Sequence, residues 1–408
     1  MKSFRKRLQR IGTQNKLVND ALGIGFETLR GAGASWRAGS VYYADILAAL
    51  RAHYADSVRL LLVEAQHGTP VPDELKPLAE NVIGYPTLRR FRPTWAIEHA
   101  RHRLFKHDLL PDRVLKEKGV DVLVCGVLER HTSLPTLALL PDFQHVHLPE
   151  LFEPNERAWR DREFAKTAAR ATRILVFSET VRADLQNFAP PFAHKARVLP
   201  PVTCVPASVY ERDPREILET YSLPEKFVYL PNQLWQHKNH LLAFQAVRAL
   251  KARGENIFIV CTGNLGDSRN TNYVSELVQS VSRWGIRENV ALLGNVPRAD
   301  VFTLMRQAAF VLNPSRFEGY GLSLAEARAV GKRVLASDLP AHREQAVPDA
   351  LYFESNNLGD LTEKLGALWH NTTAGPDSAR EAQARQTQPA RVRAYAEQWF
   401  EMIGQVLS

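Results

Sequence analysis

Residues 310–338 constrain the possible folds of this chain more than any other stretch. A short apolar run, Phe310–Leu312, is typical of a buried parallel strand, and a Pro-Ser pair ends it. Gly319 and Gly321 then predict a turn in which the backbone can approach a ligand closely. A helix of small residues follows, is expected to end at Gly331 and leads into the next apolar run. Strand, glycine turn, helix and strand in this order place free backbone N–H groups at a helix N-terminus, which suits a phosphate group.

Two glutamates flank the glycine turn. Glu318 lies at the carboxyl end of the expected strand, and Glu326 lies eight residues later, within the expected helix. From these places Glu318 can reach a group beyond the phosphates, and Glu326 can reach back toward a pair of ribose hydroxyls. Taken singly, Glu318 is equally consistent with a residue that caps the helix, and Glu326 with a solvated acid on the helix face.

The combination of Pro-Ser, Glu318, Gly-Tyr-Gly and Glu326-Ala is far more specific than its parts. It resembles the Glu-x7-Glu motif of retaining family-4 glycosyltransferases, which have the GT-B fold. The resemblance implies an α/β chain with two Rossmann-like, doubly wound domains and a C-terminal helix that returns to the first domain. It also implies transfer of a sugar from a nucleotide diphosphate donor with retention at the anomeric carbon.

Length and composition are consistent with a globular chain of two or three domains. The 408 residues are 45% hydrophobic and 24% charged, which provides ample material for a core. No apolar run approaches the roughly 20 residues needed to cross a bilayer, and the basic N-terminus lacks the apolar stretch of a signal peptide. The three cysteines are far apart, as expected of buried thiols in a reducing compartment. We therefore expect a cytoplasmic protein.

Most of the net charge of +8 lies in the first quarter of the chain. Residues 1–20 are basic, and residues 87–106 interleave basic and aromatic side chains. Such a surface suits nucleic acid, anionic lipid or a phosphorylated acceptor, and it is equally compatible with a solvated face. Because the rest of the chain indicates glycosyl transfer, we favour a membrane patch on the acceptor side and expect no nucleic-acid partner. This patch consists of Arg89, Arg90, Arg92 and Trp95. The expected location is peripheral, on the inner face of the cytoplasmic membrane.

A proline-rich segment divides the chain near residues 200–225. We assign residues 1–205 to an acceptor-side domain and residues 206–390 to a nucleotide-sugar-binding domain. Residues 391–408 have the apolar spacing of an amphipathic helix, which is the helix expected to cross back to the first domain.

Residues 231–240, Pro-Asn-Gln-Leu-Trp-Gln-His-Lys-Asn-His, supply the candidate cation. Lys238 lies at an expected helix start, where an ammonium group can meet a diphosphate. The stretch resembles bacterial surface-polysaccharide transferases of the same family, which are often mannosyl- or rhamnosyltransferases. That resemblance implies an additional arginine earlier in the loop, where this chain has Asn232 and Gln233. One positively charged side chain of this loop, rather than two, would then offset the negative charge of the leaving group.

Residues 141–150, Pro-Asp-Phe-Gln-His-Val-His-Leu-Pro-Glu, resemble the loop that faces the donor sugar in the same subgroup. The resemblance implies that His145 makes this contact, with Asp142 and His147 as alternatives. If the stretch were a strand, the two histidines would share a face and could bind a metal ion. No third ligand is evident nearby, so we do not expect a zinc site.

Residues 36–43 resemble the first loop of the family, which usually has two adjacent glycines. Ala38 occupies the first place, so the implied donor contacts there are limited to Gly39 and Ser40. The remaining donor contacts implied by the resemblance lie at the carboxyl ends of expected strands or in the glycine turn. They are Gly263, Asn295, Val296, Gly319, Tyr320, Gly321 and Leu322.

Together these features predict a retaining hexosyltransferase with Glu318, His145 and Lys238 as catalytic residues. Lys238 and the N–H groups of the glycine turn would stabilise the departing diphosphate, Glu318 would hold sugar hydroxyls and Glu326 the ribose. The expected donor is GDP-mannose, and the expected acceptor is a growing surface polysaccharide, possibly lipid-linked. No two aspartates are spaced Asp-x-Asp, so we expect neither a metal nor another cofactor. Two alternatives remain open, a GT-B sugar-nucleotide epimerase and a non-catalytic basic protein that binds nucleic acid or other anions.

Overall fold

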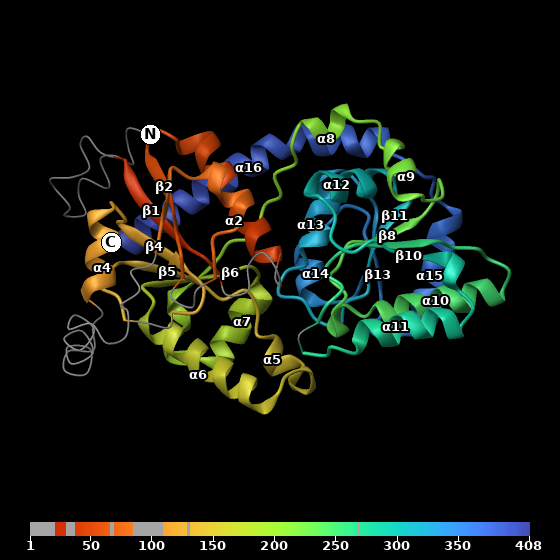
Figure 1. The fold of residues 1–408 in the computed structure, drawn as a ribbon, viewed down its shortest axis with the longest axis horizontal. Helices are drawn as coiled ribbons and strands as arrows, with labels where there is room; N and C mark the ends of the chain where they lie inside the picture. The colour runs from red at the N-terminus through yellow and green to blue at the C-terminus, as the bar shows by residue number, and fades with distance from the viewer. Residues whose placement is uncertain (1–20, 30–36, 66–68, 85–108, 129–130, 268) are drawn as a thin grey trace. The chain divides into compact units, whose positions relative to one another are not determined.

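The computed structural model describes residues 21–29, 37–65, 69–84, 109–128, 131–267 and 269–408. The chain divides into two compact units (Figure 1). The first unit consists of the described parts of Met1–Pro141, with Ala158–Val202 and Val392–Ser408. The second consists of Asp142–Arg157 and Thr203–Arg391.

The division differs from the sequence-based one in three places. Arg391, which we had assigned to the terminal helix segment 391–408, belongs to the second unit. The boundary lies between Val202 and Thr203 rather than between residues 205 and 206. Residues 142–157, which we had assigned to the first domain, group with the second unit, because their contacts are with loops of that unit.

The described part of the first unit forms a seven-stranded sheet in which all pairs are parallel. The strand order is β3-β2-β1-β4-β5-β6-β7, so the direction of progression reverses beside β1. The strands are β1 (Leu22–Glu27), β2 (Val58–Val63), β3 (Asn81–Ile83), β4 (Val122–Cys125), β5 (Thr136–Leu139), β6 (Arg173–Val176) and β7 (Ala196–Val198). The helical segments of this part are α2 (Arg37–Tyr54), η1 (Asp73–Leu78), α4 (Leu109–Glu117), most of α6 (Pro154–Arg170), α7 (Glu179–Phe188) and η3 (Pro190–Lys195).

The second unit contains a six-stranded parallel sheet of order β10-β9-β8-β11-β12-β13, which reverses beside β8. Its strands are β8 (Val228–Leu230), β9 (Ile259–Cys261), β10 (Val290–Leu292), β11 (Phe310–Asn313), β12 (Val334–Ser337) and β13 (Leu351–Phe353). Its helical segments are α5 (Gln144–His147), η2 (Pro149–Leu151), α8 (Ser208–Glu211), α9 (Glu216–Tyr221), η4 (Gln236–Lys238), α10 (His240–Ala252), α11 (Tyr273–Arg283), η5 (Arg287–Asn289), α12 (Arg298–Gln307), α13 (Leu322–Ala329), α14 (Pro340–Glu344) and α15 (Leu358–His370). Two parallel, helix-covered sheets confirm the predicted α/β, doubly wound fold class.

The strands of the second sheet are apolar on both faces because helices cover both. Leu312 of β11 packs in a cluster with side chains of α10, α11 and α15. Val311, the neighbouring residue on the same strand, packs in a second cluster with side chains of α12 and α13. Successive strand residues point to opposite faces, so one short strand contributes to two cores. This explains why the strand reads as an uninterrupted apolar run.

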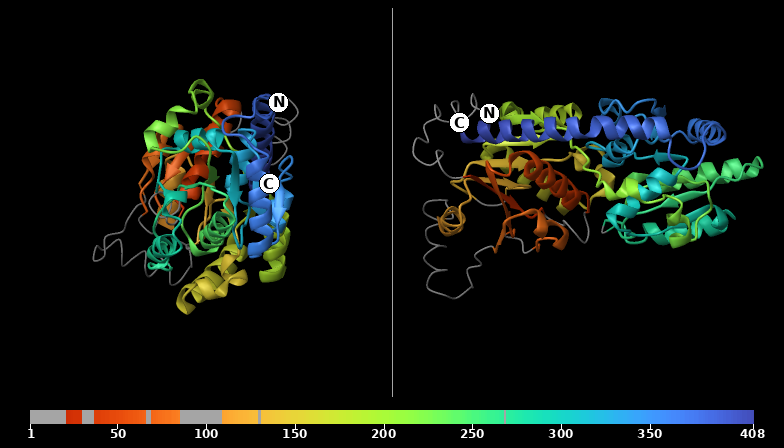
Figure 2. Two further views of the ribbon diagram at one scale, coloured as in Figure 1. Left: turned by 90° about the vertical axis from the view of Figure 1, so that its right-hand side faces the viewer. Right: turned by 90° about the horizontal axis from the view of Figure 1, so that it is seen from above.

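The last helix, α16 (Ser378–Leu407), is continuous from its start in the second unit to its end in the first (Figure 2). Trp399 is fully buried, with its ring centroid 5.8 Å from that of Phe26 on β1. The ring of Phe400 stacks on Tyr54 at the end of α2, 4.4 Å away. The aromatic residues of the expected amphipathic helix therefore pack in the first unit. Among the described residues, no helix combines the length and apolarity that crossing a membrane requires.

Gly331 ends α13, as expected from the sequence. Its φ of 69° is in the left-handed region, and it allows the N–H of Lys332 to reach the carbonyl of Ala327 at 2.8 Å. A Cβ at this position would lie 2.5 Å from the backbone of Arg380, at the start of α16. Gly254, after α10, also has a left-handed φ of 84°, but nothing lies within 4 Å of its Cβ position.

We predict that Gly254→Ala lowers the free energy of unfolding by about 1 kcal/mol, because only the backbone conformation is penalised. Gly331→Ala should cost at least ~2 kcal/mol more, because the methyl group must also displace backbone that is held by α16. Urea unfolding of both variants measures the difference. Equal losses would show that the packing of α16 against the end of α13 is loose.

Candidate functional site

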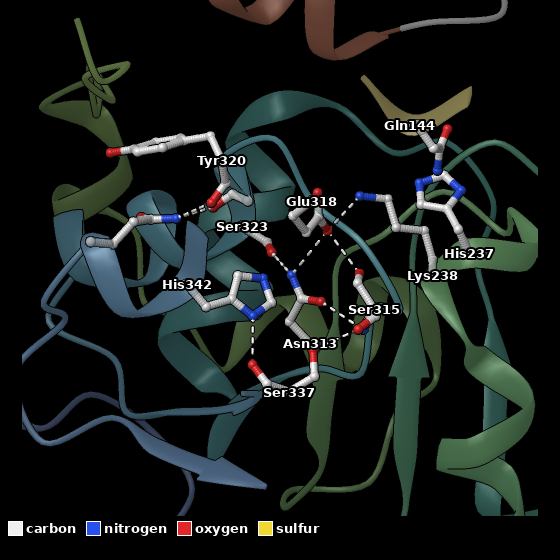
Figure 3. A network of polar contacts seen from close by, with 12 residues as sticks. Gln144, His237, Lys238, Asn313, Ser315, Glu318, Tyr320, Ser323, Ser337 and His342 are labelled. Carbon is white, nitrogen blue, oxygen red and sulfur yellow. Dashed lines mark hydrogen bonds and ion pairs between the residues drawn. The ribbon is translucent and has the colours of Figure 1, made fainter. Parts of the chain in front are cut away.

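Strand β11 ends in a loop that polar side chains hold from three sides (Figure 3). Asn313, the last residue of β11, donates from Nδ2 to Ser323 Oγ at 2.9 Å, and its Oδ1 accepts from the N–H of Ser315 at 3.1 Å. The hydroxyl of Ser337, at the end of β12, donates to the carbonyl of Ser315 at 2.6 Å. The end of β11, the end of β12 and the start of α13 are thereby joined. This fixes the path of the glycine turn.

Glu318 lies in this loop with its side chain almost fully buried. Its Oε1 accepts from Lys238 Nζ at 2.6 Å and from the Ser315 hydroxyl at 2.7 Å. Burial on its own raises the pKa of the Glu318 carboxyl, but the charge of Lys238, the neighbouring His342 ring and the hydrogen bonds from Lys238 and Ser315 outweigh it, so that the net pKa is lowered. Glu318 is therefore a carboxylate at neutral pH, paired with the predicted catalytic cation Lys238.

The glycine turn, residues 319–322, presents the start of α13. Gly321 is the N-cap residue with a φ of 91°, and no side chain of the described residues caps the helix. Gln345 donates from Nε2 to the carbonyls of Tyr320 at 2.5 Å and Gly321 at 2.9 Å. A Cβ at Gly321 would lie 3.0 Å from the ring of His342, so an added methyl group would crowd that ring and also strain the backbone. Gln345 thus holds two carbonyl groups of the turn, and the N-terminus of α13 has no side-chain cap.

Glu326 lies within α13 and is also buried, but its surroundings differ. Its Oε1 accepts from Arg298 Nη1 at 3.1 Å, where Arg298 is the first residue of α12. Burial raises the pKa of the Glu326 carboxyl, and the charge of Arg298 opposes this without overcoming it. Arg298 was not predicted from the sequence. Nothing in its local sequence distinguishes it, because its partner is 28 residues away.

Lys238 ends η4 and directly precedes the N-cap of α10, Asn239, which has a left-handed φ of 58°. The carbonyl of His237 accepts from the N–H of Arg316 at 2.7 Å, which links this loop to the loop after β11. Burial, followed by the charge of Lys238, lowers the pKa of His237 well below its usual value. The imidazole of His237 is therefore neutral.

A second cation approaches the same loop from the loop after β9. Arg269 is held by Asp267 at 3.0 Å, and its Nη2 lies 3.4 Å from Nδ1 of His237. Its guanidinium carbon lies 5.0 Å from the ring centroid of Trp235. The sequence showed Asn232 and Gln233 where an arginine was expected. The structure places the guanidinium of Arg269 beside this loop, a proximity that sequence spacing did not indicate.

The strand-end glycines lie next to each other. The N–H of Gly263, after β9, donates to the carbonyl of Gly294, after β10, at 2.8 Å. Gly263 has a φ of 130°, and a Cβ there would lie 2.7 Å from Cα of Gln233. Of the two other residues expected here, Asn295 is exposed and Val296 is buried. Backbone groups of three loops therefore approach closely at this edge of the second sheet.

The segment 142–151 is not a strand, so the condition under which His145 and His147 would share a strand face is not met. Residues 144–147 form the short helix α5, with the Asp142 carboxylate accepting from the N–H of Gln144 at 3.0 Å. His145 is buried, whereas His147 is exposed and stacks on Phe317 at 4.9 Å. A Pro-bounded four-residue helix carries too little periodicity to be recognised.

The same segment contacts two loops of the second unit. Glu150 pairs with Arg316 at 2.7 Å, and Gln144 Oε1 accepts from Arg269 Nη1 at 2.9 Å. Gln144 is buried, and its Nε2 has no hydrogen-bond partner among the described residues. Gln144 was not among the predicted site residues.

The remaining predicted residues lie in the first unit. Gly39 and Ser40 are buried in the first turn of α2, which begins at Arg37, rather than in a loop before a helix. The proposed membrane patch, Arg89, Arg90, Arg92 and Trp95, lies outside the described residues.

Comparison with known proteins identifies the second unit. Residues 215–390 match the family model described as "Glycosyl transferases group 1". A stretch of 118 residues is 30% identical to the O-antigen chain mannosyltransferase RfbU of Salmonella typhimurium, covering 29% of this chain. The chain spans 29% and 31% of the length of the curated relatives it matches.

Solved structures resemble nearly the whole chain. The glycosyltransferase of Rickettsia africae ESF-5 has a TM-score of 0.66 at 15% identity, with 95% of this chain and 99% of that chain covered. HepE of Anabaena, solved in complex with UDP and glucose, has a TM-score of 0.63 at 15% identity, with 94% and 97% covered. At these identities the likeness concerns the fold, which is the GT-B arrangement of two Rossmann-like domains. Within the second unit, residues 215–390 are thus similar to the glycosyl transferases group 1 family.

Proposed function

We propose that this chain is a retaining glycosyltransferase that moves a hexose from a nucleotide diphosphate donor to a surface polysaccharide. The observation that carries the proposal is the Glu318–Lys238 pair beside the uncapped start of α13, with Glu326 inside the same helix. An uncapped helix N-terminus favours an anion, and an adjacent ammonium group adds charge-assisted bonds. The family match of residues 215–390 supports this use of the site.

Each side chain of the site has a distinct task in this proposal. The N–H groups at the start of α13 and the ammonium group of Lys238 stabilise the negative charge that develops on the departing diphosphate. Glu318, a carboxylate in the unliganded protein, accepts hydrogen bonds from sugar hydroxyls. Glu326 accepts from the ribose hydroxyls, with Arg298 holding its carboxylate in place. Gly263, Asn295 and Val296 contact the base, and Gly39, Ser40 and His145 remain predicted donor contacts.

We further propose mannose from GDP-mannose as the transferred sugar, and membership of the mannosyl- or rhamnosyl-type subgroup. The match to RfbU and the amino-acid sequence of residues 231–240 support this assignment. Transfer proceeds without a metal ion or other cofactor, which the lack of an Asp-x-Asp pair in the sequence supports. The acceptor is an oligosaccharide that is attached to a lipid, and no nucleic acid takes part. There are two alternatives. A sugar-nucleotide epimerase would act on the donor alone, and a non-catalytic anion-binding protein would convert neither donor nor acceptor.

A thermal-shift screen with GDP-mannose, UDP-glucose and the corresponding dTDP- and ADP-sugars tests the proposal. We expect one nucleotide series to raise the melting temperature, with about 2.7 kcal/mol of stabilisation at a ligand concentration 100 times Kd. The effect should persist in EDTA. No shift with any of the sugar nucleotides would contradict the proposed function. If the protein isomerises the donor when no acceptor is present, product analysis would favour the epimerase.

We predict that the two glutamates differ in their ligand dependence. Glu326→Gln should weaken the free nucleoside diphosphate and the intact donor by similar factors, about tenfold, because both ligands contain the ribose. Glu318→Gln should leave free nucleotide binding within about threefold but lower turnover by 100-fold or more, because its contacts with the sugar strengthen in the transition state. Calorimetry with the nucleotide and kinetics with the donor give the two readings. Equal loss of nucleotide binding in two folded variants would mean that Glu318 does not hold the sugar.

The protein should also bind anionic membranes, if the basic residues of the first quarter attach it to the inner face of the cytoplasmic membrane. Attraction to such lipids contributes about 1 kcal/mol per basic residue near the surface. Flotation with vesicles of phosphatidylglycerol and phosphatidylcholine should recover the protein at low salt and release it at high salt. The quadruple variant Arg89→Gln, Arg90→Gln, Arg92→Gln, Trp95→Ala should float less than the wild type. Recovery that is equal for both proteins would exclude this patch.

A further inference from the structure

His342 is a fully buried histidine for which the proposed function above has no role. It lies in α14, directly after β12, and its side chain points toward the glycine turn (Figure 3). Its Nδ1 lies 2.8 Å from the carbonyl oxygen of Ser337. A carbonyl oxygen can only accept a hydrogen bond, so Nδ1 carries the proton. In the neutral ring, Nε2 therefore has a lone pair.

That lone pair faces the start of α13. A Cβ built on Gly321 would lie 3.1 Å from Nε2 and 3.0 Å from the adjacent ring carbon, so this edge of the ring touches the N-cap residue. Among the described residues, Nε2 has no hydrogen-bond partner, although the ring is fully buried. Buried polar groups nearly always have a hydrogen-bond partner, so a buried ring nitrogen without one needs an explanation, and a bound ligand is one. Here it borders the place where an anion would bind.

Three charged groups act on the ring, from three loops. Glu318 favours the protonated ring, Lys238 opposes it, and Asp338, next to β12, favours it. Tyr352, on β13, contacts the His342 backbone carbonyl rather than the ring. Burial is the largest influence and lowers the pKa of His342 below its usual value. In the unliganded protein the ring is therefore neutral near pH 7, and it lies next to a carboxylate that would stabilise its charge.

We propose that His342 takes up one proton from solvent when the donor diphosphate binds at residues 319–322, and that Nε2–H then donates a hydrogen bond to a phosphate oxygen. This rests on the proposed function, since it assigns a partner to the same site. Two lone pairs, one on Nε2 and one on a phosphate oxygen, repel each other at contact distance. Protonation converts that repulsion into a charge-assisted hydrogen bond. The proton comes from the buffer, and no bond of the donor breaks in this step.

The uptake can be counted by calorimetry in buffers of different ionisation enthalpy, HEPES and Tris, at pH 7.5, because a phosphate buffer would itself compete for an anion site. GDP-mannose and UDP-glucose are suitable probes, because each of their phosphates is esterified and neither gains nor loses a proton near neutrality. For the probe that binds, we expect up to one proton taken up per molecule bound. The uptake should vanish at low pH, where His342 is already protonated in the free protein. It should also vanish at high pH, where His342 is neutral in both the free and the bound protein.

Two variants assign the proton to His342. His342→Asn can keep the hydrogen bond to Ser337 but does not reach the turn, and His342→Gln can reach it with an amide that does not titrate. Both should lose the uptake and bind the donor about tenfold more weakly at pH 7, with His342→Gln the less impaired. The difference from wild type should shrink at pH 9. His370→Gln, which removes an exposed histidine paired with Glu255, should behave as the wild type does.

The outcomes separate this inference from the proposed function. If neither probe binds the wild-type protein, the proposed function fails and this inference fails with it. If a probe binds without proton uptake, or if uptake persists in both His342 variants, the proposed function stands and the inference is wrong. If uptake persists in both variants, His237 and His240, the two other buried histidines beside Lys238, become the candidates for its source.

Discussion

The ion pair between Lys238 and Glu318 is the interaction on which the arrangement of the site depends. The two side chains come from loops that follow β8 and β11, which are adjacent strands of the second sheet. Their exposed fractions are 15% and 9%, so neither charge is well solvated. Removing one partner of such a pair leaves an uncompensated buried charge, which costs about 3–5 kcal/mol. The pair therefore joins the two loops, and a variant of either residue needs a test of folding beside the test of activity.

The two glutamates of the motif show how surroundings determine charge. Both carboxyls are buried, yet the pKa of Glu318 is lowered and that of Glu326 is raised. Glu318 has a lysine, a neighbouring histidine and a serine hydroxyl that favour its charged form. Glu326 has Arg298, which is not enough to offset burial. The two glutamates are only eight residues apart in the sequence, yet their carboxyl pKa values are shifted in opposite directions.

The sequence predicted best what is encoded locally. The apolar run after Gly331 forms strand β12, and Gly331 ends α13, because an apolar run and a left-handed glycine are signals that lie within a few residues. The fold class was implied by the family resemblance of the Glu-x7-Glu motif, and the structure confirms it. The short helix α5, residues 144–147, was not predicted, because a four-residue helix has no periodicity to detect.

The sequence did not predict the partners that act on the motif from a distance. Gln345 reaches the glycine turn from α14, and Arg269 reaches His237 from the loop after β9. Arg298 reaches Glu326 from the start of α12. Each is an ordinary polar residue in its local context. Its role follows from the order of strands in the sheet, which brings loops together that are far apart in the chain.

The balance of charge at the turn explains why a titrating group there matters. Lys238 is already paired with Glu318, so to an incoming diphosphate the two together present little net charge. The partial charge at the start of α13 amounts to roughly half an elementary charge, which is less than a diphosphate carries. Arg269 is likewise held by Asp267. Of the ionisable side chains around Glu318, His342 is neutral in the unliganded protein and can become positive when an anion arrives. In our proposal, such a site contains no unpaired buried cation before binding, and His342 becomes positively charged when the donor is bound.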